Sequence, residues 1–249
     1  MAAILKSKAE QEKIHETGRI VAEVLAQLRA AVHPGITTGE LDEIAVAALA
    51  RHGAKSSSLG YHGYPKSICT SVNDEVVHGI PGERVLQEGE IVSIDFAAFY
   101  NGWHADSAIT VPVGTVSAEV QRLLKVTEES LYRGIAAARA GNRLHHISRA
   151  VQHYVEAAGF SVVRQYSGHG VGRSMHEDPQ VLNYIEQGQP NQLLKPGMVI
   201  AIEPMVNMGA KETRVLADNW TVVTADGSYS AHFEHTIAIT EGDAVILTL

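Results

Sequence analysis

LQEGEIVSID (residues 86–95) ends in an acid that lies six residues after a glycine, and LKPGMVIAIE (residues 194–203) repeats this pattern. A second acid follows each copy in a matching setting, within His-Ala-Asp at 104–106 and within His-Phe-Glu at 232–234. An unpaired carboxylate in an apolar strand costs folding free energy. Four such acids therefore indicate that cations bind between two similar halves of the chain, and we expect a pair of divalent cations.

Helical patterns occur in the same order in both halves. In each half, apolar residues at helical spacing define a long helix, a shorter helix follows, and strands come last. The first half is expected to have a helix over 9–32 and a second helix that begins at the capping box Thr37-Thr38-Gly39-Glu40 and ends at Gly53. Residues 54–90 are expected to be loop-rich, and 91–100 and 103–113 to be strands. In the second half, the expected helices are 117–140 and about 144–158. This order predicts one α+β domain over residues 1–249, with an internal pseudo-repeat of 1–113 and 114–249.

Asn101-Gly102 lies between residues that favour strands, which is a strong signal for a hairpin with a two-residue type I′ turn. That turn fixes the register, so that Ala97 faces Asp106 and Asp95 faces Ala108. The two aspartates then become diagonal neighbours on one face, with backbones roughly 7–8 Å apart. A solvated hairpin face that carries two aspartates by chance would fit the same pattern. The repeat of the acids in the second half favours metal binding.

A fifth ligand candidate is His169 in the segment SGHGVG (167–172). The glycines on both sides let backbones approach closely and expose the imidazole to an ion. The segment lacks the Lys-Ser/Thr ending of a phosphate-binding loop, so a phosphate site is the weaker interpretation. Four carboxylates and one imidazole suit two ions about 3.5–4 Å apart, and this oxygen-rich set suits Mn, Fe, Co or Zn.

The composition bounds the class of protein. The chain has 249 residues, of which 45% are hydrophobic, and a formal net charge of -8, with no cluster of Lys or Arg that would predict nucleic-acid binding. Cys69 is the single cysteine, so an intrachain disulfide is impossible; a buried apolar role is favoured over a nucleophilic one. No apolar run approaches the length of a membrane span. We expect a cytoplasmic protein with no membrane contact.

Several motifs occur in an order and spacing that is specific to one family. They are GYHGYPKSICTSVNDEVVHGIPG (60–82), SIDFAAFYNGWHADSAIT (93–110), SGHGVGRSMHEDP (167–179), IAIEPMVN (200–207) and SAHFEHTIAIT (230–240). With these motifs the sequence resembles the type I methionine aminopeptidases, in a compact bacterial-like form, over essentially its whole length. The resemblance implies the pita-bread fold, in which two pseudo-symmetric halves form a central curved antiparallel sheet flanked by helices.

The resemblance also implies how the five ligands are shared between two divalent ions. Asp106 and Glu234 would bridge both ions, Asp95 would complete one, and His169 with Glu203 would complete the other. The identity of the metal stays open among Co, Mn, Fe and Zn.

Further residues match the family's active site. His78 and His176 correspond to two catalytic histidines that are not ligands, whereas for His62, His104 and His232 a loop histidine bonded to backbone is the favoured interpretation. The methionine pocket of the family matches Tyr61, Tyr64, Cys69, His78 and Trp220, and Met175 and His176 complete the expected substrate-binding residues. Ser58 and Met175 stand where bacterial relatives can have Cys and Phe, which leaves the shape of this pocket open. Asn73 and Ser230 match contributors to a monovalent-cation site in some relatives.

The implied activity is removal of an N-terminal methionine, preferably before a small second residue. A water or hydroxide that bridges two metals would attack the carbonyl, Glu203 would move the proton, His176 would donate to the oxyanion, and His78 would position the amide nitrogen. N-terminal methionine peptides and nascent chains are the implied partners, with transient ribosome contact and a monomeric state. Two alternatives are an X-Pro aminopeptidase or prolidase, and a pita-bread binding protein without catalysis.

Overall fold

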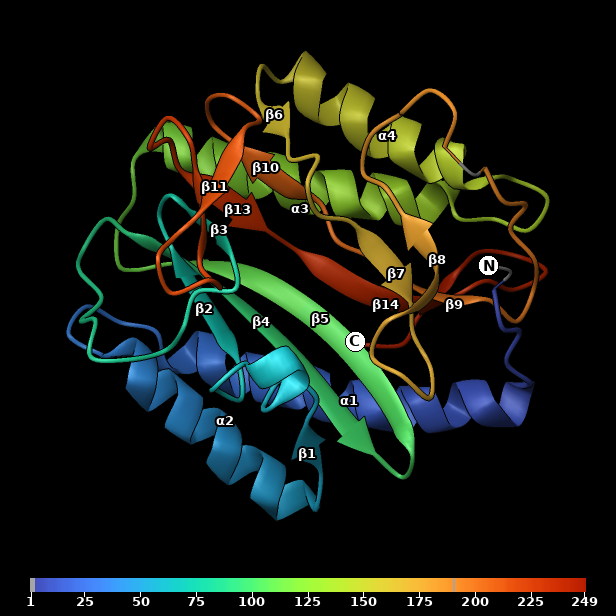
Figure 1. Cartoon of the computed structure of the whole chain (residues 1–249), viewed down its shortest axis with the longest axis horizontal. Coiled ribbons are helices and arrows are strands. Elements are labelled where there is room, and N and C mark those ends of the chain that lie inside the picture. Colours follow the sequence, from blue (N-terminus) through green and yellow to red (C-terminus); the bar gives the residue numbers. More distant parts are fainter. Residues whose placement is uncertain (1–2, 190) are drawn as a thin grey trace.

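A curved antiparallel sheet lies between two pairs of helices in the computed structural model, which describes residues 3–189 and 191–249 (Figure 1). The helices are α1 (Lys8–Ala31), α2 (Thr38–His52), α3 (Ala118–Ala137) and α4 (Leu144–Ala157), with a 3-10 turn η1 (Tyr61–Gly63). Buried apolar side chains form one cluster beneath α1 and α2 and another beneath α3 and α4. None of the helices in the described residues is long and apolar enough to cross a lipid bilayer.

The strands form one large sheet and two small ones within the described residues. The large sheet runs in the order β1 (Lys55–Ser56), β4 (Ile91–Tyr100), β5 (Trp103–Pro112), β14 (Glu234–Ala238), β9 (Val199–Ile202), β7 (Gly168–Gly170) and β8 (Glu177–Val181), with β2 (Cys69–Val72) on β4 and β15 (Val245–Ile246) on β14. The small sheets are β13 (Ser230–His232), β10 (Met205–Asn207) and β6 (Ser161–Val162), and β11 (Thr213–Val215), β12 (Val222–Thr224) and β3 (Glu75–Val77).

The predicted helices are confirmed, and their ends follow from local capping. At the start of α2, the Thr37 side chain accepts a hydrogen bond from the Glu40 amide at 3.1 Å, and the Thr37 amide donates to the Glu40 carboxylate at 2.7 Å. This is the predicted capping box, and it satisfies two amides that have no partner within the helix. Gly53 ends α2 in the left-handed region, with φ of 63°.

The predicted hairpin of β4 and β5 is confirmed in turn type and in register. Asn101 and Gly102 have φ of 48° and 84°, the positive values that a type I′ turn requires. Ala97 lies opposite Asp106, and Asp95 lies opposite Ala108. The short turn therefore sets which residues of the two strands share a face.

The expectation of a loop-rich stretch over residues 54–90 was incomplete, because this stretch contains β1, β2 and β3. All four residues of β2 are buried, so this strand shows no alternation of apolar and polar residues by which a sequence pattern could detect it. Its pairing with β4 places Cys69 opposite Asp95.

Candidate active site

Neighbouring strands align four acidic side chains on one face of the large sheet. Asp95 of β4 and Glu234 of β14 both lie opposite Ala108 of β5, one on each side of that strand. Asp106 is two residues from Ala108, so its side chain projects from the same face. Glu203 directly follows β9, which pairs with β14. The first half of the chain thus supplies two of the acids and the second half supplies the other two.

His169 reaches these acids from β7, where glycines on both sides allow neighbouring backbones to approach. A Cβ atom on Gly168 would lie 2.2 Å from the carbonyl oxygen of Ala201, and one on Gly170 would lie 2.3 Å from that of Asp178. Real Cβ atoms do not occupy such short distances, so any larger residue would push the strands apart. The close approach predicted for these two glycines is confirmed.

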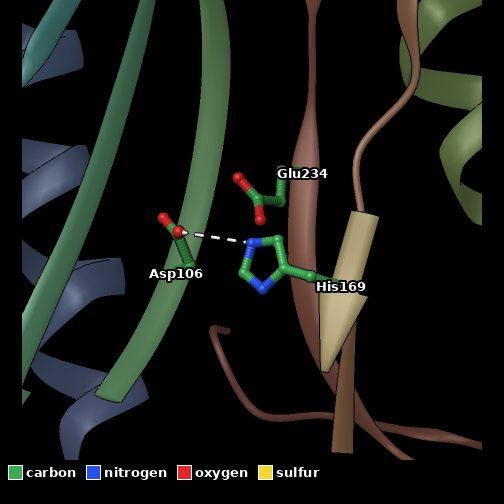
Figure 2. A group of neighbouring side chains, drawn as sticks. All are labelled: Asp106, His169 and Glu234. Carbon is green, nitrogen blue, oxygen red and sulfur yellow. Dashed lines mark ion pairs between the residues drawn. The ribbon is translucent and has the colours of Figure 1, made fainter. Parts of the chain in front are cut away.

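Asp106, His169 and Glu234 point toward one another from three strands (Figure 2). Each offers a metal-ligating atom, and these atoms lie within 4.8 Å of one another. His169 Nε2 also lies 3.6 Å from Glu203 Oε1, and Asp95 lines the same cavity as the other four residues. The structure thus brings together all five side chains that the sequence singled out as metal ligands.

Burial dominates the electrostatics of the cluster. It raises the pKa of Asp95, Asp106, Glu203 and Glu234 above ordinary values, and the charge of Asp95 raises the pKa of Asp106 further. Burial also lowers the pKa of His169 to about 3, so this imidazole is neutral at physiological pH. Buried acids that share one space repel one another once ionised. A cation bound between them would remove that cost.

Two further observations fit a divalent metal. Asp106 Oδ1 and Glu234 Oε1 are buried without a hydrogen-bond partner among residues 3–189 and 191–249. The Nδ1 atom of His169 is 2.9 Å from the Gly170 carbonyl oxygen. A proton on Nδ1 leaves Nε2, the ring nitrogen that faces the acids, free to bind a metal ion. A second ring nitrogen held by a carbonyl is the usual arrangement for metal-binding histidines.

A cavity of about 320 Å³ contains the cluster and the residues predicted for the methionine pocket. Its lining includes Ser58, Tyr61, Tyr64, Cys69, His78, Met175, His176 and Trp220, together with the five candidate ligands. The Tyr64 ring packs edge-on against Trp220 with centroids 5.0 Å apart, and the Tyr64 hydroxyl donates to the Gly79 carbonyl at 2.8 Å. The wall is therefore aromatic and held in place by a buried hydrogen bond.

The two histidines assigned to catalysis both line this cavity. His176 Nδ1 is 2.7 Å from the Tyr61 hydroxyl, and its ring centroid is 4.2 Å from that of His169. His78 has φ of 62°, a left-handed conformation that is costly for a residue other than glycine and that clusters at functional sites. Burial lowers the pKa of His78 to about 4.

The interpretation of His232 as a loop histidine bonded to backbone was wrong. It lies in β13, is 2% exposed, and its two ring nitrogens have no hydrogen-bond partner in the described part of the chain. Its Nε2 is 3.9 Å from Glu203 Oε2, inside the cavity. The matched His-X-acid pattern at 104–106 and 232–234 was the signal that could have identified it. His104 also differs from expectation, because it lies in β5 with Nδ1 2.8 Å from the Ser57 hydroxyl.

Cys69 and the candidate monovalent-cation residues have defined surroundings. Cys69 is a free, buried thiol whose pKa is raised by burial and then by Asp95, which favours the protonated form over a nucleophilic thiolate. The Ser230 amide donates to the Asn73 carbonyl at 2.8 Å, so these two residues are adjacent. The Asn73 side-chain oxygen accepts the Ile91 amide at 3.1 Å. A monovalent cation at this place stays a prediction.

Residues 12–241 match the sequence profile of metallopeptidase family M24. The chain belongs to this family. It is 56% identical to methionine aminopeptidase 1 of Bacillus subtilis over 98% of both chains, which confirms the resemblance drawn from the motifs. Its structure matches the crystal structure of methionine aminopeptidase from Rickettsia prowazekii with a TM-score of 0.97, 39% identity and full coverage of both chains.

The M24 fold extends to more distant proteins. Xaa-Pro dipeptidase from Bacillus anthracis matches with a TM-score of 0.81 at 22% identity, and the match covers 99% of this chain and 62% of that one. This likeness shows a common fold alone. The predicted pita-bread fold is confirmed, and the chain is an M24 metallopeptidase with a buried Asp, His and Glu cluster suited to a divalent metal.

Removing metal with a chelator is expected to lower the melting temperature more at about pH 7 than at about pH 5. Burial raises the folded-state pKa values of the four acids, that of Asp95 to about 6, so the stability of the chelated protein falls as pH rises from the unfolded values of these acids through their folded values. The lowered pKa of His169 does not change the comparison, because this ring is neutral in the folded chain with and without metal. Thermal unfolding with and without chelator measures the difference. Equal differences at the two pH values would contradict this account.

Proposed function

We propose that this chain is a methionine aminopeptidase that hydrolyses the first peptide bond of chains beginning with methionine, preferably before a small second residue. The single observation that carries the proposal is the meeting of five metal-ligand candidates within a cavity of about 320 Å³ lined by aromatic and sulfur-bearing side chains. The relative from Bacillus subtilis, named a methionine aminopeptidase, supports the same activity. Nascent chains in the cytoplasm would be the biological substrate.

The cluster would hold two divalent ions, with Asp95, Asp106, His169, Glu203 and Glu234 as the residues that bind them. Four carboxylates balance the charge of two dications, which supports this number. When bound, such ions lower the pKa of water and polarise the scissile carbonyl. The oxygen-rich ligand set suits Mn, Fe, Co or Zn.

Glu203 would carry the proton from the attacking water to the leaving amine. Burial raises its pKa well above the ordinary value, and the neighbouring charge of Asp106 raises it further. A carboxylate with a raised pKa binds a proton more readily and can hold it until the amine leaves. The backbone carbonyl oxygen of Glu203 accepts a hydrogen bond from the side-chain amide of Asn183 at 2.9 Å, which fixes the backbone at this position.

His176 would donate a hydrogen bond to the oxyanion that forms at the scissile carbonyl. Burial lowers its pKa, so the ring is neutral and carries one N–H group. The Tyr61 hydroxyl at Nδ1 can donate to that nitrogen, which places the ring proton on Nε2. His78, which lines the same cavity, would position the amide nitrogen of the substrate.

The methionine side chain would lie against Tyr64, Cys69 and Trp220. A thioether makes favourable contacts with aromatic rings, and methionine adapts to irregular walls. The protonated Cys69 thiol adds a small polarizable contact without negative charge. Met175, also on the wall, is itself flexible, and it would adjust to the substrate side chain.

A comparison of peptides tests this function against the X-Pro alternative. After chelation, Mn, Fe, Co and Zn are added back in turn, and release of the first residue from Met-Ala-Ser and from an X-Pro dipeptide is measured. We expect at least one metal to restore methionine release, with little cleavage of the X-Pro bond. Faster cleavage of the X-Pro dipeptide would overturn the proposal, and absence of cleavage with every metal would favour a binding protein. A monomeric state, ribosome contact and a monovalent cation at Asn73 and Ser230 stay predictions.

A further inference from the structure

The residues that precede α1 lie against the second half of the chain (Figure 1). The Lys6 amide donates to the Gly197 carbonyl at 2.7 Å, and Gly197 has φ of 93° with the Lys6 carbonyl oxygen 3.0 Å from the position of a Cβ atom. Gly197 belongs to the turn that leads into β9 and Glu203. The Gln11 side chain fixes the segment from the other side, since it donates to the Lys6 carbonyl at 2.9 Å.

Lys6 forms a buried ion pair with Glu177, 171 residues further along the chain. Lys6 Nζ lies 2.5 Å from Glu177 Oε2, and the two side chains are 3% and 7% exposed. The ammonium also donates to the Ile4 carbonyl at 3.0 Å. Burying two charges costs desolvation free energy that an apolar pair would avoid, so stability alone is a weak reason for this arrangement.

The second oxygen of Glu177 closes the loop that joins β7 to β8. Oε1 accepts the backbone amides of Arg173 at 2.7 Å and Ser174 at 3.2 Å. Gly172 lies so close to the pair that a Cβ atom on it would be 2.4 Å from Glu177 Oε1 and 2.7 Å from Lys6 Cε. The Glu177 carboxylate therefore binds the loop between β7 and β8 through Oε1 and the segment before α1 through Oε2.

This loop, residues 172–177, carries His176 immediately before Glu177. Two kinds of contact hold this loop. The His176 side chain is held by its hydrogen bond with the Tyr61 hydroxyl. The loop backbone is held by the Glu177 carboxylate, which accepts its amides and is itself fixed by the ion pair with Lys6. A small displacement of the loop would move the imidazole relative to the candidate metal ligands, among them His169, whose ring centroid is 4.2 Å from that of His176.

We propose that Lys6, acting through Glu177, is a positioning residue that holds loop 172–177 so that His176 faces the reacting carbonyl. The inference rests on the proposed function. Lys6 lies outside the cavity lining, so it contacts neither substrate nor metal, and its effect on the reaction passes through the loop. The segment before α1 thus serves the active site although it lies far from the ligands in sequence.

A double-mutant cycle tests this role. Lys6→Met keeps the apolar stem and removes the ammonium, and Lys8→Met removes an exposed ammonium two residues away as a matched control. We expect Lys6→Met to lower kcat on Met-Ala-Ser by about 10-fold to 100-fold, because a displacement on the order of 1 Å is that costly. In a His176→Ala background the same change should cost less than about twofold, because the group it positions is gone. Lys8→Met should match the parent, and bound metal should be unchanged in all variants.

Three outcomes would overturn the inference. The first is that Lys6→Met has parental kcat while His176→Ala is impaired; this result contradicts the role of Lys6 and leaves the proposed function intact. The second is an equal loss in both backgrounds, which indicates general destabilisation. The third is a fully active His176→Ala variant, which removes the proposed role of His176 as well. Should Lys6→Met fail to fold, the paired variant Lys6→Met with Glu177→Gln removes both charges and keeps an oxygen for the loop amides, and the same cycle applies.

Discussion

Glu234→Gln is expected to lower kcat/KM on Met-Ala-Ser by about 10³-fold or more, because it removes one of the four carboxylates proposed to hold the two ions. Glu234 is 2% exposed and lies within 4.8 Å of ligand atoms of Asp106 and His169. A neutral amide does not balance the charge of a dication. Metal content of the purified variant should fall in parallel with activity.

Glu234→Gln is expected to raise the thermal stability of the metal-free chain, although it lowers the activity of the metal-bound one. Burial raises the pKa of Glu234, and the charges of Asp106 and Glu203 raise it further, so its ionised form opposes folding at neutral pH. The chelated Glu234→Gln variant should therefore melt above the chelated parent. Glu241→Gln, at an exposed acid near the C-terminal end of β14, serves as the control and should change neither quantity. A variant that retains both metal and activity would refute the assignment of Glu234 as a metal ligand.

His176→Ala is expected to lower kcat by about 10²–10³-fold, the usual cost of removing one oxyanion donor. Its ring lies next to His169 but is not one of the five candidate ligands, so bound metal and thermal stability should stay close to parental values. This separates the variant from Glu234→Gln, in which metal and activity are lost together. Steady-state kinetics and metal analysis on the same preparations measure both effects.

His153→Ala is a suitable control for His176→Ala, since His153 is an exposed histidine on α4 far from the cavity lining. It should have parental kcat and KM. If His176→Ala has parental kcat as well, the oxyanion is stabilised by another group. His232, whose ring nitrogens lie unpartnered beside Glu203 within the described residues, would then be the next residue to substitute.

The sequence predicted those parts of the fold that depend on short-range rules. The Asn101-Gly102 turn determines the pairing of β4 with β5, and the Thr37 capping box determines where α2 begins. The convergence of the acids was predictable for a different reason. Buried acids repeated at matching places in two halves are costly unless they meet around a shared positive charge.

Features that depend on long-range contacts could not be predicted. The short strand β2 is buried on all four residues and carries no periodic signal, so its pairing with Asp95 became visible only in the structure. The partner of Lys6 is 171 residues away, and no local pattern marks a lysine as buried. His232 was misjudged because a histidine in sequence does not reveal whether its ring nitrogens find partners.

The pairing of β5 with β14 has a consequence for how the enzyme could be assembled. This seam joins a strand from each half, and each of these strands carries one of the acids proposed to hold the ions. A fragment that contained only one half would have two of the four acids, and so it would lack the complete set of metal ligands. Ion binding is therefore thermodynamically linked to the union of the two halves: an ion held by acids from both halves stabilises the assembled sheet, and neither half alone can supply the full set of ligands.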